Sequence, residues 1–437
     1  MAVSPGAKKA LIAVGVLTVA GALLVGIGHW RAHDLVAGDV VWHTEVDRAA
    51  GEAVVVRGRI YTYEDDQLMI RDLGTGKVIA EELQDGNWAH VGDGGHVATV
   101  GVEQIAMYDR NGKLAWQQAT DDLYHPIAIS LDGQLDAVVC EEKACSTVHF
   151  DASGQETTRT PRLSPDLATP VYVGSGTFED THVRRVPTIA TDIDPKTHSV
   201  RQLRDGKPLG APITLLDDHT AAQVGDLLVG VSRENGTCTF TATRAGIRAW
   251  TTTTPCPELG FPEVDVFADR IYLNSRSGDA YDIVTTDLEG RRASSFRVST
   301  GPIEESDRTQ LSPTPAAVVL TVTDQISAYS PTTGKRLWTE DLNRASHDVL
   351  EKTKKVYPGV EVSGPVIDRF GNDPRPVAQL AVGRDLPAYT HTFIDSESGK
   401  ESAKLAAPYG SVAHGLEDGR VLVLGRDDVW LVSSDPE

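Results

Sequence analysis

Basic residues are few in this chain compared with acidic ones. Its 437 residues include 41 Lys and Arg against 62 Asp and Glu, which gives a formal net charge of −21 at pH 7. Because an acidic surface repels phosphate backbones, this deficit argues against nucleic acid as a partner. The acidic residues are spread along the chain and are not gathered into one tail, which favours a solvated surface over a patch for cations or for a basic partner.

Cysteine is also scarce, with four residues: Cys140, Cys145, Cys238 and Cys256. None stands in a C-x-x-C pair or near a pair of histidines, so zinc binding is disfavoured. An even number of cysteines in an exported chain suggests disulfides, and four cysteines allow three pairings. We favour the local pairs Cys140–Cys145, across one hairpin, and Cys238–Cys256, between neighbouring strands of one repeat. Free buried thiols are the alternative.

Sequence signatures of catalysis are absent too. The chain has no G-x-S-x-G or H-E-x-x-H motif and no D-x-D-x-D-G loop for Ca²⁺. Asp217-Asp218-His219 is better explained as a polar turn than as a metal site. Asn235-Gly236-Thr237 fits both an N-glycosylation pattern and an Asn-Gly hairpin turn. We therefore predict no catalytic residue, no metal ligand and no cofactor.

One long apolar run is present, at the N-terminus. Ala10 to Gly28 is uncharged and follows Lys8 and Lys9. Its 19 residues would span roughly 28 Å as a helix, close to the hydrocarbon thickness of a bilayer. The bulky exit at Trp30 favours an uncleaved signal anchor over a cleaved signal peptide, and the two lysines leave the N-terminus in the cytoplasm. We predict a cytoplasmic N-terminus at 1–9, a transmembrane anchor at 10–30, a linker at 31–38 and an extracytoplasmic domain at 39–437, placed at the cell membrane.

Beyond this segment the chain alternates short runs rich in Val, Ile and Thr with turn residues, which is typical of strands. A short sequence motif recurs, most clearly at 329–338 and again at 70–79 and 107–116. It consists of Asp or Ser, a Gly turn, a basic residue and an apolar strand. Four strands per period of about 40 residues is the signature of propeller blades. The turns lie near Gly76, Gly112, Gly154, Gly206, Gly246, Gly290, Gly334 and Gly399.

The first and last segments of this array are each incomplete, and together they would form one blade. The last segment offers three strands, at 411–415, 420–425 and 428–432, whereas the strand at 40–46 has no unit of its own. If that strand supplies the missing outer strand of the last blade, the ring closes and its open edges disappear. We predict an all-β fold, a closed β-propeller of eight four-stranded blades, with seven or nine blades as alternatives.

The stretch at 328–338, Ala-Tyr-Ser-Pro-Thr-Thr-Gly-Lys-Arg-Leu-Trp, resembles the repeat of the PQQ-like β-propeller superfamily. The resemblance covers about residues 39–437. Quinoprotein dehydrogenases share this repeat but often stack the quinone on a disulfide of adjacent cysteines, and this chain has no adjacent cysteines. The repeat alone is no sign of the cofactor. The resemblance implies that the tryptophans at the matching place dock between adjacent blades: Trp42, Trp116, Trp250 and Trp338.

These observations lead us to expect a non-enzymatic, membrane-anchored propeller that acts as an interaction or scaffold module in a bacterial cell envelope. Its partner would be an envelope or extracellular protein, and the chain would be a monomer. The alternative is a PQQ-dependent dehydrogenase-like enzyme or another propeller enzyme. The segments Gly174–Pro187 and Asn343–Arg375 exceed what closure of a blade requires, so we expect them to carry specific contacts.

A relative within the superfamily is the outer-membrane β-barrel assembly lipoprotein, a scaffold that contacts other envelope proteins. This chain lacks the lipid-attachment cysteine of that relative, and its apolar N-terminal segment would serve as the anchor instead.

Overall fold

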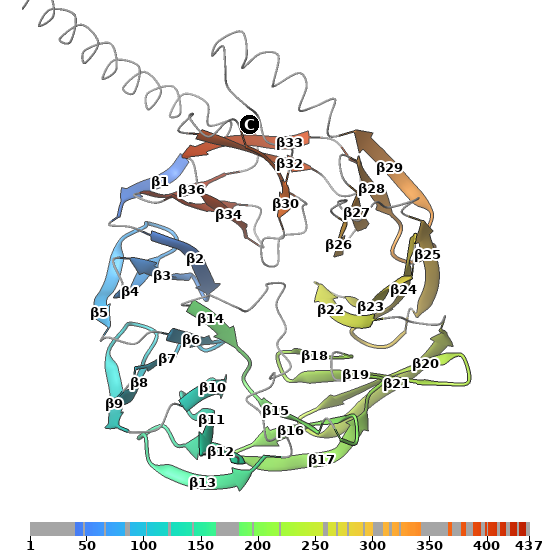
Figure 1. Ribbon diagram of the computed structural model, residues 1–437. Helices are drawn as coiled ribbons and strands as arrows, with labels where there is room; N and C mark the ends of the chain where they lie inside the picture. The colour runs from blue at the N-terminus through green and yellow to red at the C-terminus, as the bar shows by residue number, and fades with distance from the viewer. Residues whose placement is uncertain are drawn as a thin grey trace, which may run out of the picture.

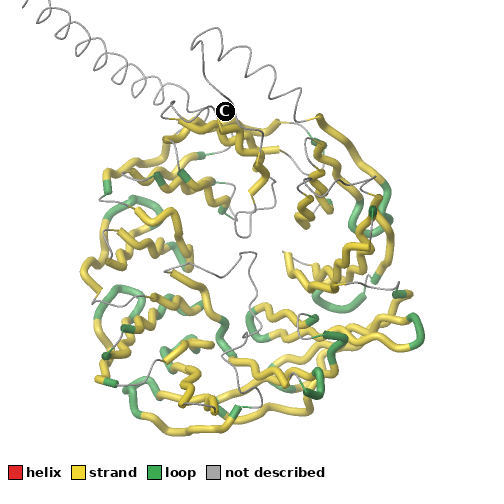
Figure 2. The backbone as a smooth tube through the Cα atoms, viewed as in Figure 1, coloured by secondary structure: helices red, strands yellow, loops and turns green. Residues whose placement is uncertain are grey.

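The structure is a computed structural model that describes most of residues 40–433. Its longer gaps are 163–182, 300–308, 342–365, 369–376 and 382–387. The described residues form strands and turns and contain no helix (Figure 2). Accordingly, no membrane-spanning helix occurs among them, and the predicted anchor at 10–30 lies outside them.

The described part of the chain forms 36 strands in nine sheets. The first sheet consists of β2 (Ala49–Val56), β3 (Arg59–Glu64), β4 (Gln67–Asp72) and β5 (Val78–Leu83). The second consists of β6 (Trp88–Gly92), β7 (Val97–Val100), β8 (Gln104–Tyr108) and β9 (Leu114–Ala119), joined by β14 (Val183–Val186). The third consists of β10 (Tyr124–Ile129), β11 (Leu135–Glu141), β12 (Ala144–Phe150) and β13 (Glu156–Pro161). The next three consist of β15 (Ala190–Asp194), β16 (Ser199–Arg204) and β17 (Lys207–Thr214); β18 (Ala221–Val224), β19 (Leu227–Glu234), β20 (Thr237–Arg244) and β21 (Ile247–Pro255); and β22 (Phe261–Phe267), β23 (Arg270–Ser277), β24 (Ala280–Asp287) and β25 (Ser294–Ser299). The last three consist of β26 (Thr309–Pro313), β27 (Val318–Val322), β28 (Gln325–Tyr329) and β29 (Arg336–Asp341); β30 (Val366–Asp368), β31 (Val377–Ala381), β32 (Ala388–Ile394) and β33 (Glu401–Pro408); and β34 (Val412–Gly415), β35 (Val421–Leu424) and β36 (Asp428–Val432) with β1 (Val40–Glu45).

The sheets follow one another around a common centre, as the blades of a β-propeller do (Figure 1). Within most sheets the chain runs from the innermost to the outermost strand through antiparallel hairpins. The third strand of a sheet lies between two neighbouring sheets, and all eight residues of β24 are accordingly buried. The outermost strand β1 alternates between exposed and half-buried residues, because one of its faces meets solvent.

The N-terminal strand completes the last sheet, as the sequence predicts. β1 pairs antiparallel with β36, from Val40 opposite Val432 to Glu45 opposite Asp428. It thereby becomes the fourth and outermost strand of a sheet whose other three strands come from the C-terminal end of the chain. This pairing joins the two ends of the described chain within one sheet.

The number of sheets is nine, one more than the favoured prediction of eight blades and equal to one of its two alternatives. Each of the eight predicted glycine turns joins the last two strands of a different sheet, and their φ angles all lie between 65° and 84°. The ninth sheet has no such turn, because its outer strand arrives from the other end of the chain. A count of turns therefore misses this sheet.

The fourth sheet departs from the pattern, because it has three strands. The strand that precedes it in the chain, β14, instead adds to the inner edge of the second sheet and pairs with β6 in parallel, with Arg184 opposite His90. Just beyond β14, the carbonyl oxygen of Pro187 accepts a hydrogen bond of 2.9 Å from the backbone N–H of Ile129. The segment thus lies against the inner strands of two sheets.

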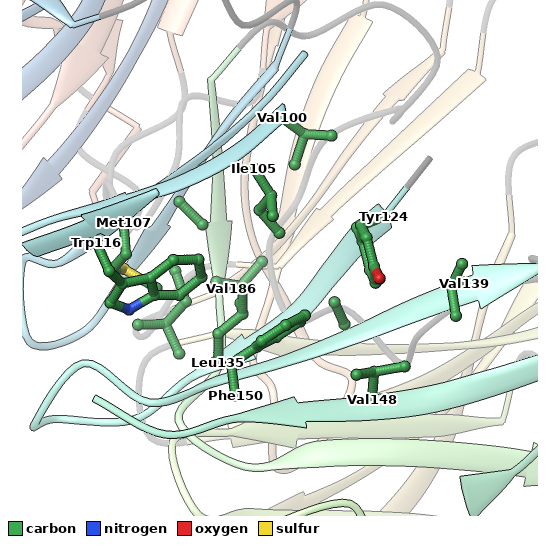
Figure 3. Packing of buried hydrophobic residues seen from close by; sticks show 13 residues of the cluster. Val100, Ile105, Met107, Trp116, Tyr124, Leu135, Val139, Val148, Phe150 and Val186 are labelled. Atoms are coloured by element: carbon green, nitrogen blue, oxygen red, sulfur yellow. The ribbon is translucent and has the colours of Figure 1, made fainter. Parts of the chain in front are cut away.

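The hydrophobic core is divided among the boundaries between neighbouring sheets. Figure 3 shows the boundary between the second and third sheets, where Met107 and Trp116 face Leu135 and Phe150. The Trp116 and Phe150 rings lie 5.6 Å apart between centroids. Because the described clusters draw on successive sheets, such as the second and third, these sheets are stabilised largely by their neighbours.

Candidate functional site

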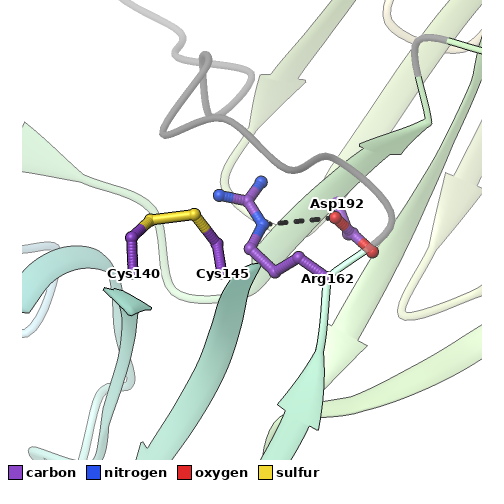
Figure 4. Close-up of a disulfide and its surroundings, with 4 residues drawn as sticks. All are labelled: Cys140, Cys145, Arg162 and Asp192. Carbon is purple, nitrogen blue, oxygen red and sulfur yellow. Dashed lines mark hydrogen bonds and ion pairs between the residues drawn. A yellow bond between two sulfur atoms is a disulfide. The ribbon is translucent and has the colours of Figure 1, made fainter. Parts of the chain in front are cut away.

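The boundary between the third and fourth sheets carries charged groups in its interior, and we describe it as the candidate site. Arg162 directly follows β13, and its backbone N–H donates to the carbonyl oxygen of Cys145 at 2.9 Å. This bond continues the ladder one residue beyond the strand and sends the Arg162 side chain across the boundary. There its Nε donates to Oδ1 of Asp192, on β15, at 3.3 Å (Figure 4).

Asp192 also bonds a second arginine. Asp192 and Arg201 are opposite each other in the β15–β16 ladder, and Arg201 Nη2 donates to Asp192 Oδ2 at 3.1 Å. The side chains of Arg162 and Asp192 are 1% and 2% exposed, whereas that of Arg201 is 21% exposed. One buried carboxylate is therefore shared by two guanidinium groups, a cluster named here the Arg162–Asp192–Arg201 triad.

Part of this triad has no hydrogen-bond partner. Both Nη atoms of Arg162 and the Nε of Arg201 are buried without one. A guanidinium has five N–H donors, and four of those of Arg162 are on its Nη atoms. Buried donors of this kind are normally satisfied, so the unpaired edge of Arg162 is the most unusual chemical feature of the boundary.

The disulfide Cys140–Cys145 lies beside Arg162 (Figure 4). The two cysteines are opposite each other in the β11–β12 ladder, with Cα atoms 4.0 Å apart. Both pack in the apolar cluster that fills the middle of the same boundary, together with Ile127, Ala128, Val138, Ala190 and Leu203. The bond thus closes the hairpin that borders the triad.

A second polar group lies between the same two sheets, around His149. Its Nδ1 is 2.9 Å from Oδ1 of Asp136, and the same carboxylate oxygen accepts the backbone N–H of Gly206, in the turn of the fourth sheet, at 3.2 Å. Burial alone would lower the pKa of His149, but the hydrogen bond and the charge of Asp136 outweigh it and raise that pKa. Burial raises the pKa of Asp136. The pair ties the third sheet to the fourth.

Two further histidines lie under β14 at the inner edge of the ring. Burial, reinforced by the charges of Arg184 and His125, lowers the pKa of His90 to about 3. The pKa of His125 is lowered by burial and by Arg184. His90 Nδ1 and His125 Nε2 are buried without a hydrogen-bond partner. Both rings are therefore neutral near pH 7.

The four predicted tryptophans occupy equivalent places. Each lies on the outermost strand of its sheet and against the glycine turn of the next sheet: Trp42 against Gly76, Trp116 against Gly154, Trp250 against Gly290 and Trp338 against Gly399. The indole N–H of Trp42 donates to the carbonyl oxygen of Leu73 at 2.8 Å, and that of Trp250 to Leu288 at 2.7 Å. A blade-packing role is our interpretation of these contacts.

One copy of the repeat that lacks the tryptophan uses a different ring. Phe296, on β25, covers Gly334 of the next sheet, with a ring carbon 2.6 Å from where a Cβ would stand. The sequence alone does not reveal this replacement, because Phe296 lies at a different spacing from the preceding glycine. A flat aromatic ring of either type can cover a backbone turn.

The second cysteine pair, Cys238–Cys256, is also joined as a disulfide, with Cα atoms 4.9 Å apart. Both residues belong to the apolar cluster between the fifth and sixth sheets. The Asn235-Gly236 pair forms the β19–β20 hairpin turn, with φ angles of 48° and 73°. Thr220 Oγ1 accepts the backbone N–H of Asp217, a polar turn as expected, although residues 218 and 219 lie outside the described part.

The predicted contact segments fall largely beyond what the structure describes. Of Gly174–Pro187 only 183–187 is described, and of Asn343–Arg375 only 366–368.

Sequence reasoning missed the triad, because its members lie 30 and 9 residues apart in three different strands or strand ends and form no motif. Among the described residues, no group of three or more His, Cys, Asp or Glu side chains is arranged to hold a metal ion.

Neither protein-family models nor curated proteins give a match to this chain. Among solved structures, it is similar to BamB from Moraxella catarrhalis, at 12% identity and a TM-score of 0.38, over 91% of this chain and 99% of that one. It is also similar to the dihydro-heme d1 dehydrogenase NirN (16% identity, TM-score 0.40, 86% and 79% covered) and to the WD40 domain of SCAP from fission yeast (9%, 0.45, 92% and 99%). Identities and TM-scores this low carry no inference about the function of this chain.

Proposed function

We propose that this chain is a membrane-anchored β-propeller on the extracytoplasmic side that binds a protein partner as an interaction or scaffold module and catalyses no reaction. The PQQ-dependent dehydrogenase-like enzyme is the alternative. The main support is the distribution of the connections between sheets.

In most sheets the chain runs from the inner to the outer strand, so the return connections leave from one side of the ring, called here the connection side. The connection from β9 to β10 is short, running from Ala119 to Tyr124. Those from β13 to β14 and from β29 to β30 are long, running from Pro161 to Val183 and from Asp341 to Val366. Connections of this length usually carry function, because blade closure does not require them.

The Cys140–Cys145 hairpin belongs to the same side. Its loop joins the second and third strands of the third sheet, and Arg162 emerges beside it at the end of β13. Rigid sheets that carry long connections on one side suit the recognition of a protein surface, because the scaffold holds the contacting segments in place.

The anchoring part of the proposal rests on the apolar segment at 10–28 and on the position of β1. Since β1 begins at Val40 on the outermost position of the last sheet, residues 1–39 join the ring at its perimeter. A membrane helix at 10–30 would therefore hold the ring by its rim and leave the connection side open to a partner.

In-cell crosslinking of the full chain, with identification of the crosslinked proteins, tests the interaction. We expect a reproducible partner whose capture is lost when 343–355 is deleted. Undiminished capture by the deleted chain would count against a contact role for that segment. A bound quinone in the mass or absorption spectrum of the purified protein would favour the enzyme alternative.

Extraction of membranes with alkaline carbonate tests the anchor. The full chain should stay with the membrane fraction, and a chain without 10–30 should be released. Release of the full chain would contradict the anchoring part and leave the interaction part to the crosslinking experiment.

A further inference from the structure

The unpaired Nη atoms of Arg162 favour a negatively charged partner. The triad contains two guanidinium groups and one carboxylate, so with both arginines protonated and Asp192 ionised these three groups carry one net positive charge. A guanidinium group is a permanent cation that donates hydrogen bonds and accepts none. A buried, incompletely paired charge is strongly unfavourable, and one additional negative charge would neutralise the cluster.

The geometry also limits the shape of that partner. The Nε of Arg162 already bonds Asp192, which leaves the two Nη atoms to face away from that carboxylate (Figure 4). Two oxygens in one plane, as in a carboxylate, can accept from such an edge in parallel. The apolar cluster beside it, with Ala190 and Leu203, disfavours a doubly charged anion, whose desolvation costs more.

We propose that the Arg162–Asp192–Arg201 triad is a binding site for a monoanionic carboxylate, taken by the Nη edge of Arg162. Asp192 is the positioning residue, because it holds the guanidinium plane through Nε. The assignment goes beyond the proposed interaction function, since the carboxylate can belong to a small acid or to a protein partner. Both Nη atoms are buried, so binding requires a local movement of the groups that cover them.

Thermal unfolding of the full chain in detergent tests this site, with sodium acetate titrated against sodium chloride at equal ionic strength. We expect a saturable rise in Tm of about 2–5 °C with acetate over chloride, because a ligand that binds only the folded state stabilises it. Arg162→Gln should abolish the rise. Arg162→Lys should weaken it, because an ammonium group cannot donate two parallel bonds to one carboxylate.

Arg159→Gln is the matched control. Arg159 lies on β13, the strand that Arg162 directly follows. Its Nε pairs with Glu156 Oε1 at 3.0 Å, and its side chain is 35% exposed. This variant should keep the full acetate response. A parent protein that responds equally to acetate and chloride would overturn the proposal, and so would an acetate response retained in Arg162→Gln. Should Arg162→Gln fail to fold, an undiminished response in Arg162→Lys has the same meaning.

A second arm separates the two sources of the carboxylate. The peptide acetyl-Ala-Glu-Ala-amide carries one side-chain carboxylate, and its Gln counterpart carries none. A response to the Glu peptide alone supports a carboxylate on a protein partner. A response to acetate but to neither peptide supports a small free acid. A response to both peptides would show that the carboxylate is not recognised and would overturn the assignment.

Discussion

The contact between a glycine turn and an aromatic ring recurs around the molecule, and Gly290 shows why it requires glycine. Its φ is +73°, in the left-handed region, and a Cβ on it would stand 2.5 Å from a Trp250 ring carbon. A side chain at Gly290 would therefore be unfavourable for two separate reasons: the backbone conformation is strained for other residues, and there is no space for a Cβ.

Gly290→Ala and Gly236→Ala separate these costs. Gly236 has the same φ of +73°, but nothing lies within 4 Å of where its Cβ would stand. We expect Gly236→Ala to lower the free energy of unfolding by about 1 kcal/mol through conformation alone. Gly290→Ala should cost about 1–3 kcal/mol more, because Trp250 has to move. Urea unfolding measures both, and equal losses would show that the ring contact is unimportant.

Two buried histidines should make stability depend on pH in opposite directions. The pKa of His149 is raised by Asp136 in spite of burial, whereas burial lowers the pKa of His90 to about 3. A raised pKa means that the folded state binds more protons than the unfolded state, and a lowered pKa means that it binds fewer.

For His149, the stabilising contribution is fully present below its ordinary pKa of 6.5 and is lost as the pH rises through the raised value. His149→Gln should therefore reduce the loss of unfolding free energy between pH 6.5 and 8.5. Urea titrations at four pH values give the slope. Asp136, whose pKa is also raised, acts in the same direction but at lower pH. An unchanged slope in His149→Gln would contradict the assignment.

For His90, stability is present above pH 6.5 and is lost as the pH falls, because only the unfolded state then takes up the proton. The loss should approach about 1 kcal/mol for each pH unit once the pH is well below 6.5. The glutamine of His90→Gln cannot titrate, so the unfolding free energy of this variant should depend less on pH between pH 6.5 and 5. An equally steep loss in His90→Gln would assign acid sensitivity to another group.

At the scale of elements, β1 is the strand on which the joining of the two chain ends depends. It pairs with β36, and its Trp42 lies on Gly76 of the first sheet and donates to Leu73 at 2.8 Å. One side chain therefore links the last sheet to the first. Trp250 makes the same pair of contacts from β21, a strand that a hairpin turn joins to its sheet neighbour β20.

Trp42→Ala and Trp250→Ala should consequently differ in kind. Each should cost about 2–4 kcal/mol of stability by loss of ring burial and of one hydrogen bond. Only Trp42→Ala should accelerate amide exchange in both β1 and β36, because β1 has no covalent neighbour in its sheet. Hydrogen exchange read by mass spectrometry distinguishes them. Equal protection of β1 in the two variants would show that Trp42 does not hold the joint.

At the scale of the whole molecule, exposed apolar residues lie near the start of several outermost strands. Val41 on β1, Val78 on β5 and Leu114 on β9 are 45%, 40% and 44% exposed, and their sheets are consecutive in the ring. Exposed Lys77 and Lys113 precede two of them. Ile247 begins β21 on a distant sheet and is 75% exposed.

If residues 10–30 anchor the ring through a short linker, the rim nearest β1 should face the bilayer. Photoreactive residues at 78 and 114, in the full chain reconstituted into vesicles, should then crosslink to lipid several-fold more than one at 247. The apolar side chains and lysines suit the interface between headgroups and acyl chains. Equal crosslinking at all three positions would mean that the ring has no preferred orientation on the membrane.

Much of the architecture follows from local chemistry. The glycine turns at 76 and 334 adopt a positive φ, which glycine reaches at least cost, and strand runs such as 97–100 are buried as their apolar character predicts. The place of β1 followed from counting a missing strand. The favoured count of eight blades was one too low, and the alternative of nine is correct; the ninth sheet, formed by the three C-terminal strands and β1, has no glycine turn of its own.

The sequence by itself indicated the strands, their turns and the pairing of the first strand with the last sheet, and it favoured the local cysteine pairs. These depend on backbone sterics, on alternation over a few residues and on the need to cover a strand edge. Only the tertiary structure placed β14 beside β6 and brought Arg162 to Asp192. Those contacts depend on how the sheets pack around a common centre. Because the residues that make them lie far apart in the chain, no local sequence pattern predicts these contacts.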